Sequence, residues 1–213
     1  MGSDQISTVH SLTGQRFLAL GDSYTIGDSV VESERWPNQL VSQLRAEQLD
    51  LDLPTIIAQT GWTSGELITE INAAKPIGRF DLVSLLIGVN NQYRGLDQEQ
   101  YLKELDHLLD MAIQFVGGNP ICVVVLSIPD WSVTPFAADR DRIAISKEID
   151  HFNQGKRERT LRHGCQFIDV SQLSRNASQD ASLLADDGLH PSGKMYATWC
   201  EKVLPAARRA LET

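Results

Sequence analysis

Cysteine is scarce in this 213-residue chain, and long apolar runs and an excess of positive charge are missing. Its three cysteines, Cys122, Cys165 and Cys200, are too few and too scattered for a disulfide-stapled secreted domain. No run approaches the roughly eighteen apolar residues of a membrane span, so we expect no stable membrane anchor. Nineteen Lys and Arg against twenty-eight Asp and Glu give a formal charge of −9, which argues against nucleic acid as a partner.

Targeting and metal-binding patterns are also missing. The first residues, MGSDQISTVHSLTG, have neither the basic start nor the apolar core of a secretory signal. A cytoplasmic location is therefore favoured, and a periplasmic or secreted one fits if a leader has been removed. No C-x-x-C pair or His-rich cluster predicts a metal site, and we expect no cofactor. The length fits one domain over residues 1–213, with a loose N-terminal segment over residues 1–14 and an oligomeric state left open.

Short apolar runs alternate with longer amphipathic stretches along the chain. The runs are rich in Val, Ile and Leu, as strands buried on both faces should be, and lie at 16–20, 54–58, 81–88, 121–128 and 165–170. Helices are expected over 36–49, 63–74, 97–116, 141–163 and 191–212. This alternation predicts an α/β protein: a single three-layer αβα domain with a five-stranded parallel sheet, flavodoxin-like in architecture. Ligands of such sheets bind beyond the carboxyl ends of the strands.

A serine and a histidine with a nearby acid fall at this edge of the predicted sheet. Ser23 ends the first apolar run in LALGDSYTIG, and His190 precedes the last helix in DGLHP. A serine hydroxyl needs an adjacent base to become a nucleophile, and the imidazole of His190 can supply it. Asp187, three residues earlier, can fold back to orient that imidazole and stabilise its protonated form. Asp186 competes for this role.

Acyl transfer also needs hydrogen-bond donors for the developing oxyanion, each contributing roughly 3–4 kcal/mol. The candidates are the backbone N–H groups of Ser23 and Gly61 and the side-chain amide of Asn90. Four aromatic residues on or beside the same loops either line a small apolar acyl pocket or cap the core: Trp62, Tyr93, Trp131 and Phe136. The long segment PDWSVTPFAADRDR fits a wall or lid over the site.

Four sequence blocks carry a family resemblance: GDSYTIG, the glycine at Gly61, GVNN and DGLHP, in this order. They resemble the successive blocks of the GDSL (SGNH) hydrolases over residues of about 16 to 210. The resemblance implies an esterase with Ser23 as nucleophile, His190 as general base and acid, and Asp187 orienting His190. It likewise implies an oxyanion hole made by Ser23, Gly61 and Asn90. The chain departs from the pattern at Asn91, where the family commonly has aspartate.

The resemblance allows several small-molecule ester substrates. Short-chain acyl or acetyl esters, including acetylated carbohydrates, are favoured because no long apolar surface helix is available to dock on lipid. Lysophospholipase or thioesterase activity of the same family is the alternative. Two non-catalytic hypotheses also remain: a flavodoxin-like binding module, which has no need of Asp187 and His190, and an esterase-derived protein that binds without turnover.

Overall fold

The protein is built around a five-stranded parallel sheet, as the alternation of apolar runs predicts. A computed structural model describes residues 14–213, so the expected loose segment lies outside the described residues except for Gly14. The strand order is β2-β1-β3-β4-β5, and every neighbouring pair is parallel. The strands are β1 (Phe17–Gly21), β2 (Thr55–Ala58), β3 (Leu82–Leu86), β4 (Val123–Leu126) and β5 (Gln166–Ile168).

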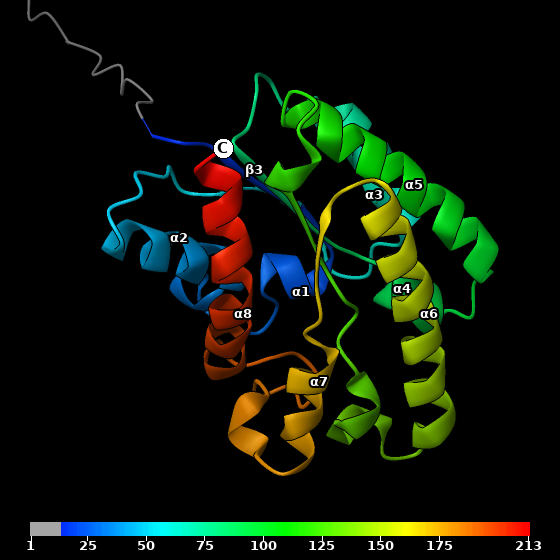
Figure 1. Cartoon of the computed structure of the whole chain (residues 1–213). Helices are drawn as coiled ribbons and strands as arrows, with labels where there is room; N and C mark the ends of the chain where they lie inside the picture. Colours follow the sequence, from blue (N-terminus) through cyan, green and yellow to red (C-terminus); the bar gives the residue numbers. More distant parts are fainter. Residues whose placement is uncertain (1–13) are drawn as a thin grey trace, which may run out of the picture.

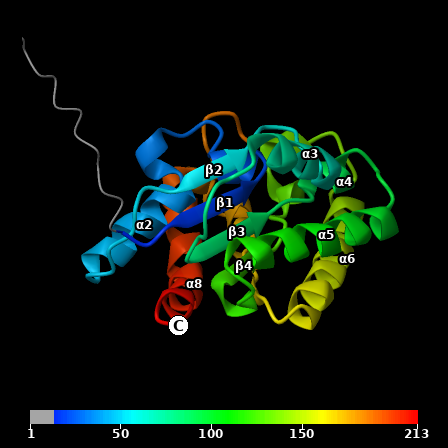
Figure 2. The ribbon, with the colours of Figure 1, turned by 90° about the horizontal axis from the view of Figure 1, so that it is seen from above.

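Helices cover both faces of the sheet, which makes a single three-layer α/β domain (Figures 1 and 2). On one face lie α2 (Trp36–Ala46) and α8 (Gly193–Leu211), and on the other α3 (Ser64–Ala74), α5 (Gln98–Phe115) and α6 (Arg142–Arg162). These five match the helices expected from the sequence. Shorter α-helices not anticipated there are α1 (Ser23–Ile26), α4 (Val89–Tyr93) and α7 (Ser171–Ser174). The 3₁₀ turns are η1 (Glu32–Glu34), η2 (Pro120–Cys122), η3 (Trp131–Val133), η4 (Pro135–Ala137), η5 (Arg175–Ser178) and η6 (Ala181–Leu183).

The central strands form the core because helices exclude water from both sides of them. Every residue of β1, β3 and β4 is buried. The predicted strands at 81–88 and 121–128 overshoot the observed ones by up to two residues at each end. Ile87 and Ile128 lie beyond the ladder and are nevertheless fully buried. A run of apolar residues indicates that a segment is buried, and the buried segment extends beyond the residues that pair in the sheet.

The adjacency of β1 and β3 creates the place where a ligand site is expected. From β1 the chain crosses to β2 on one side, whereas β3 and β4 lie on the other, so the loops after β1 and β3 diverge from a common point. The two short helices α1 and α4 begin there. Within residues 14–213, no helix is long and apolar enough to cross a membrane. The same residues include no cluster of three or more His, Cys, Asp or Glu placed to hold a metal ion.

Candidate active site

The turn after β1 presents Ser23 at the start of α1. Asp22 caps this helix through its side chain, which accepts a hydrogen bond from the Tyr24 N–H at 3.1 Å. A side chain at Gly21 would collide with Thr25 Oγ1 and the carbonyl oxygen of Leu86, so only glycine lets the strand turn directly into the helix. Ser23 is therefore held at the first helical position, 5% exposed, with a pocket in front of it.

His190 is oriented by Asp187. The His190 Nδ1 lies 2.6 Å from Asp187 Oδ2, which also accepts a hydrogen bond from Ser29 Oγ at 2.7 Å. The other carboxylate oxygen accepts from the backbone N–H groups of Leu189 and His190, both at 2.9 Å. Burial alone would raise the pKa of Asp187, but these hydrogen bonds outweigh it and hold that pKa well below its usual range. Asp187 rather than Asp186 is thus the acid that faces the imidazole.

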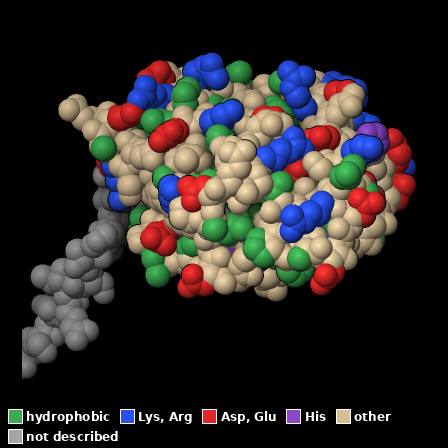
Figure 3. Space-filling view, turned by 90° about the horizontal axis from the view of Figure 1, so that it is seen from below, with side chains coloured by type: hydrophobic (Ala, Val, Ile, Leu, Met, Phe, Trp, Pro, Cys, Tyr) green, Lys and Arg blue, Asp and Glu red, His purple; other side chains and the backbone are tan. Residues whose placement is uncertain are grey.

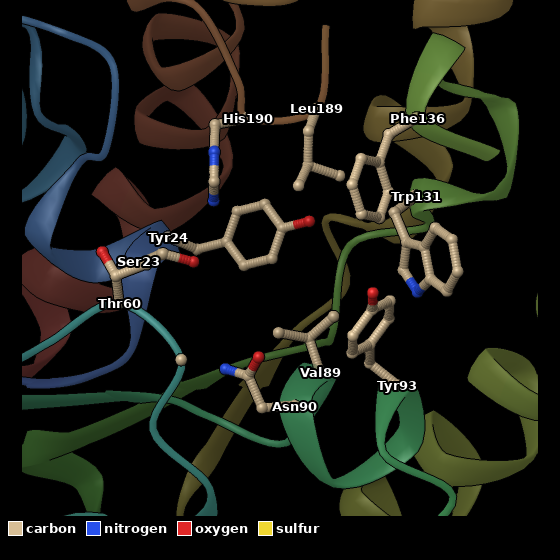
Figure 4. A pocket seen from close by; sticks show the side chains of 11 residues that line it. Ser23, Tyr24, Thr60, Val89, Asn90, Tyr93, Trp131, Phe136, Leu189 and His190 are labelled. Carbon is tan, nitrogen blue, oxygen red and sulfur yellow. The ribbon is translucent and has the colours of Figure 1, made fainter. Parts of the chain in front are cut away.

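The Asp187 hydrogen bond determines which nitrogen of the imidazole is available to a substrate. With Nδ1 engaged, Nε2 is the nitrogen left to act as a base. His190 and Ser23 line the same pocket, and Figure 4 shows the His190 ring directed toward the side of the pocket that holds Ser23. The described residues include no hydrogen bond between Ser23 Oγ and the ring, an arrangement common in sites without substrate.

The three candidate oxyanion donors also meet in this pocket, from the segments that follow three different strands: β1, β2 and β3. Gly61 has a φ of +89°, which L-residues with a side chain rarely adopt, and its carbonyl oxygen accepts a hydrogen bond from Arg94. Asn90 Nδ2 donates to the Trp62 carbonyl oxygen at 2.9 Å. This bond uses one of the two amide hydrogens, fixes the amide plane and leaves the other hydrogen for a ligand.

The pocket has a volume of about 170 Å³ and is lined by Ser23, Tyr24, Thr60, Gly61, Val89, Asn90, Tyr93, Trp131, Phe136, Leu189 and His190. Three aromatic rings lie at the end away from Ser23, as Figure 4 shows, and pack against one another. The Tyr93 centroid lies 5.5 Å from that of Trp131 and 6.1 Å from that of Phe136. The Arg140 guanidinium lies over all three rings at 4.9 to 5.5 Å, a cation–π arrangement that holds this wall together.

One predicted pocket residue is not part of this lining. Trp62 is half-buried and packs against the hydrophobic core, which corresponds to the second of the two alternatives stated for the four aromatic residues. The positive φ of Gly61 redirects the chain just before Trp62, and only the backbone carbonyl of Trp62 serves the site. Four further lining residues were not predicted from the sequence, and each is the direct chain neighbour of a predicted one: Tyr24, Thr60, Val89 and Leu189.

Asn91, the departure from the family pattern, joins α4 to the start of α3. It is 2% exposed, its Oδ1 accepts from the Ser64 N–H at 3.0 Å, and its Nδ2 donates to Ser64 Oγ at 2.7 Å. The Ser64 hydroxyl in turn donates to Glu104 Oε2 on α5. The amide therefore fits its surroundings: it supplies a donor to a hydroxyl whose own hydrogen is engaged by Glu104.

Two ionisable side chains near the nucleophile are fully buried: Asp22 in the turn itself and Lys156 on α6. Burial raises the pKa of Asp22 to about 7. Burial lowers the pKa of Lys156 to about 7, and the nearby Asp22 partly opposes that shift. Lys156 Nζ donates to the Ile87 carbonyl oxygen at 2.9 Å, just before the loop that carries Asn90. This lysine links α6 to the end of β3 below the pocket.

Comparisons with known proteins agree with this arrangement. A profile described as the GDSL-like lipase/acylhydrolase family matches residues 19–198. The crystal structure of TesA is similar, with a TM-score of 0.72 and 21% identity, covering 92% of this chain and 100% of that one. The psychrotrophic esterase EstA from Pseudoalteromonas sp. gives a TM-score of 0.70 at 18% identity, covering 93% of this chain and 100% of that one.

The acetylxylan esterase Axe2 from Geobacillus stearothermophilus gives a TM-score of 0.64 at 18% identity, covering 94% of this chain and 95% of that one. These structures share the fold. A search of curated protein sequences gives no match. The family profile matches most of this chain, residues 19–198, so the chain belongs to the GDSL-like lipase/acylhydrolase family and is a carboxylic ester hydrolase.

Proposed function

We propose that this ester hydrolase acts through an acyl-enzyme formed on Ser23 and that its substrates carry short acyl groups. The observation that carries the proposal is the 2.6 Å contact between Asp187 Oδ2 and His190 Nδ1, beside a pocket that Ser23 also lines. An ion pair that served only the protein surface would not need its histidine to line a pocket together with a serine, as His190 does with Ser23.

The first chemical step is attack by Ser23 Oγ on the ester carbonyl carbon. His190 Nε2 takes the hydroxyl proton as the C–O bond forms, and the Asp187 carboxylate stabilises the resulting imidazolium. The carbonyl oxygen gains a negative charge, which the N–H groups of Ser23 and Gly61 and the Asn90 amide are placed to receive.

Collapse of this intermediate breaks the bond to the alcohol. The imidazolium of His190 returns its proton to the departing alcohol oxygen, which leaves the acyl group on Ser23 Oγ. A water molecule then attacks the acyl-enzyme in the same way. His190 removes a proton from the water, the oxyanion forms again in the same place, and its collapse releases the carboxylic acid while Ser23 Oγ takes the proton back from His190. Each proton that His190 accepts is given back within the same half-reaction.

The size and chemistry of the pocket support short acyl groups. A volume of about 170 Å³ is smaller than the roughly 300–1,000 Å³ of sites for drug-sized ligands. Aromatic rings packed under the Arg140 guanidinium form the wall at the end away from Ser23. Lys and Arg are interspersed with Asp and Glu on the face seen in Figure 3, which suits an uncharged substrate. Two structurally similar proteins are named acetylxylan esterases, so acetylated carbohydrates belong among the candidates.

The test is hydrolysis of p-nitrophenyl esters from acetate to palmitate by the wild type and Ser23→Ala. Loss of the nucleophile should lower kcat by roughly 10⁶-fold. Ser33→Ala, which removes an exposed hydroxyl with no hydrogen-bond partner among the described residues, is the matched control. Equal activity of wild type and Ser23→Ala would refute the acyl-enzyme. Faster turnover of decanoyl and longer esters than of acetyl esters would refute the short-acyl proposal and favour lipid substrates.

A further inference from the structure

Besides the nucleophile Ser23, Tyr24 carries a hydroxyl in the pocket that has no partner among the described residues, whereas its polar neighbours at the aromatic end are paired. Trp131 Nε1 donates to Gln92 Oε1 at 2.9 Å, and the Tyr93 hydroxyl accepts from Arg140 at 3.0 Å. The Tyr24 hydroxyl makes no hydrogen bond to any of residues 14–213, and Tyr24 lines the pocket although only 3% of the residue is exposed. This hydroxyl is not among the buried polar atoms, so it is open to the pocket and free to pair with a ligand or with water.

The phenol of Tyr24 is held in a defined position. Its ring packs against His190, with centroids 5.6 Å apart, and against Trp199, with centroids 6.2 Å apart. In Figure 4 the ring extends from beside Ser23 across the pocket, and the hydroxyl points into the space bounded by Leu189 and Val89. Burial raises the pKa of this phenol far above its usual value, so the group remains an O–H able to donate and to accept.

We propose that Tyr24 is a specificity-determining residue whose hydroxyl binds a polar substituent on the acyl group, a hydroxyl or keto oxygen close to the ester carbonyl. The inference rests on the proposed function, because it places the acyl group on Ser23 and its chain in this pocket. The Tyr24 ring starts beside Ser23 and carries its hydroxyl across the same small pocket (Figure 4), so an acyl chain that extends from Ser23 Oγ into the pocket passes this hydroxyl.

Selectivity between the two kinds of ester depends on whether the bound acyl group gives the Tyr24 O–H a hydrogen-bond partner. A purely alkyl chain displaces water from the phenol and leaves the Tyr24 O–H dry and unpaired. A hydroxyacyl chain of the same shape restores that hydrogen bond. Sites that offer a hydrogen bond to a substrate hydroxyl reject analogues without it far more strongly than apolar pockets reject one extra methylene.

The competing explanation is that the hydroxyl faces water alone. A second cavity of about 10 Å³ adjoins Tyr24, Asp130, Thr134 and Ser174, which is room for about one water molecule. If Tyr24 only holds a water molecule there, removing its hydroxyl does not change the relative rates of polar and apolar esters.

The experiment compares esters of nearly identical shape. Ethyl 2- and 3-hydroxybutanoate, both enantiomers of each, are measured against ethyl 2- and 3-methylbutanoate by titrating the released acid. The variants are Tyr24→Phe, which keeps the ring packed on His190, and Tyr93→Phe, which removes a hydroxyl that already has a partner in Arg140. Melting temperatures report that each variant folds.

We expect the wild type to favour at least one hydroxy ester in kcat/KM, and Tyr24→Phe to reduce that hydroxy-to-methyl ratio by about tenfold. Tyr93→Phe should keep the wild-type ratio. The inference is overturned if the ratios of wild type and Tyr24→Phe agree for all pairs. Ser23→Ala distinguishes failure of the acyl-enzyme mechanism from failure of the Tyr24 inference. Turnover that survives in Ser23→Ala refutes the proposed function. Turnover that depends on Ser23 but shows unchanged hydroxy-to-methyl ratios in Tyr24→Phe refutes only the role of Tyr24.

Discussion

Replacing Asp187 by asparagine tests the proposed mechanism most sharply, because it changes one atom and leaves the shape intact. Asp187 Oδ1 accepts from the N–H groups of Leu189 and His190, and an asparagine carbonyl oxygen keeps both bonds. The other position becomes an NH₂ group that donates to His190 Nδ1. The imidazole then carries its hydrogen on Nε2 and can no longer accept the proton of Ser23.

The size of the fall in kcat distinguishes control of the His190 tautomer from the loss of a single hydrogen bond. If Asp187 contributed only one hydrogen bond to a charged group, about 1.5–3 kcal/mol, kcat would fall roughly tenfold to 150-fold. A reversed tautomer together with an unstabilised imidazolium should lower kcat by about 10⁴, or about 5.4 kcal/mol of transition-state stabilisation. The melting temperature should change little, since the turn keeps its two backbone hydrogen bonds.

The assay is p-nitrophenyl acetate hydrolysis from pH 4 to 9, with Asp186→Asn as control. That variant removes the same charge one residue away, where no hydrogen bond to the imidazole exists. Its activity should stay within about twofold of wild type, because exposed charges are screened by water. The hydrogen bonds to Asp187 keep its pKa well below the usual range. It therefore stays ionised across this interval, so Asp187 should contribute no step to the pH profile of the wild type.

Two results would refute the reasoning. If Asp187→Asn loses less than about a hundredfold in kcat, the tautomer of His190 is not what the carboxylate controls. If Asp186→Asn is impaired as strongly as Asp187→Asn, the effect belongs to the charge of the loop rather than to the hydrogen bond.

The remaining predictions concern the oxyanion site and its support. Asn90→Ala should lower kcat by about 10²–10³ with little change in KM, measured on p-nitrophenyl acetate, because one of three oxyanion donors is lost; a drop below threefold would contradict its role. Asn91→Asp should destabilise the fold by about 1–3 kcal/mol, because the Ser64 hydroxyl cannot donate to the new carboxylate and to Glu104 at once. Adding Glu104→Gln should recover most of that loss in thermal unfolding, and a purely additive double variant would contradict the coupling.

The strands, the long helices and the candidate site residues could be predicted from short segments of the sequence. The strands and long helices follow from the period and apolarity of short segments, and the family blocks place Ser23, Gly61, Asn90 and His190 at the ends of those segments. Because parallel strands bring their carboxyl ends to one edge, chain order alone predicts that these residues meet, and they line one pocket. Their catalytic roles remain predictions until the variants are measured.

The residues that only the tertiary structure could place depend on segments distant in the chain. Trp62 and Tyr24 both neighbour a predicted site residue, yet the positive φ of Gly61 sends one to the core while the helix after Ser23 aims the other into the pocket. Asn91 is explained by Glu104, and Lys156 is buried although its helix is rich in charge. Sequence patterns report the periodicity and composition of one segment, whereas side-chain direction, burial and hydrogen bonding depend on the segment packed against it.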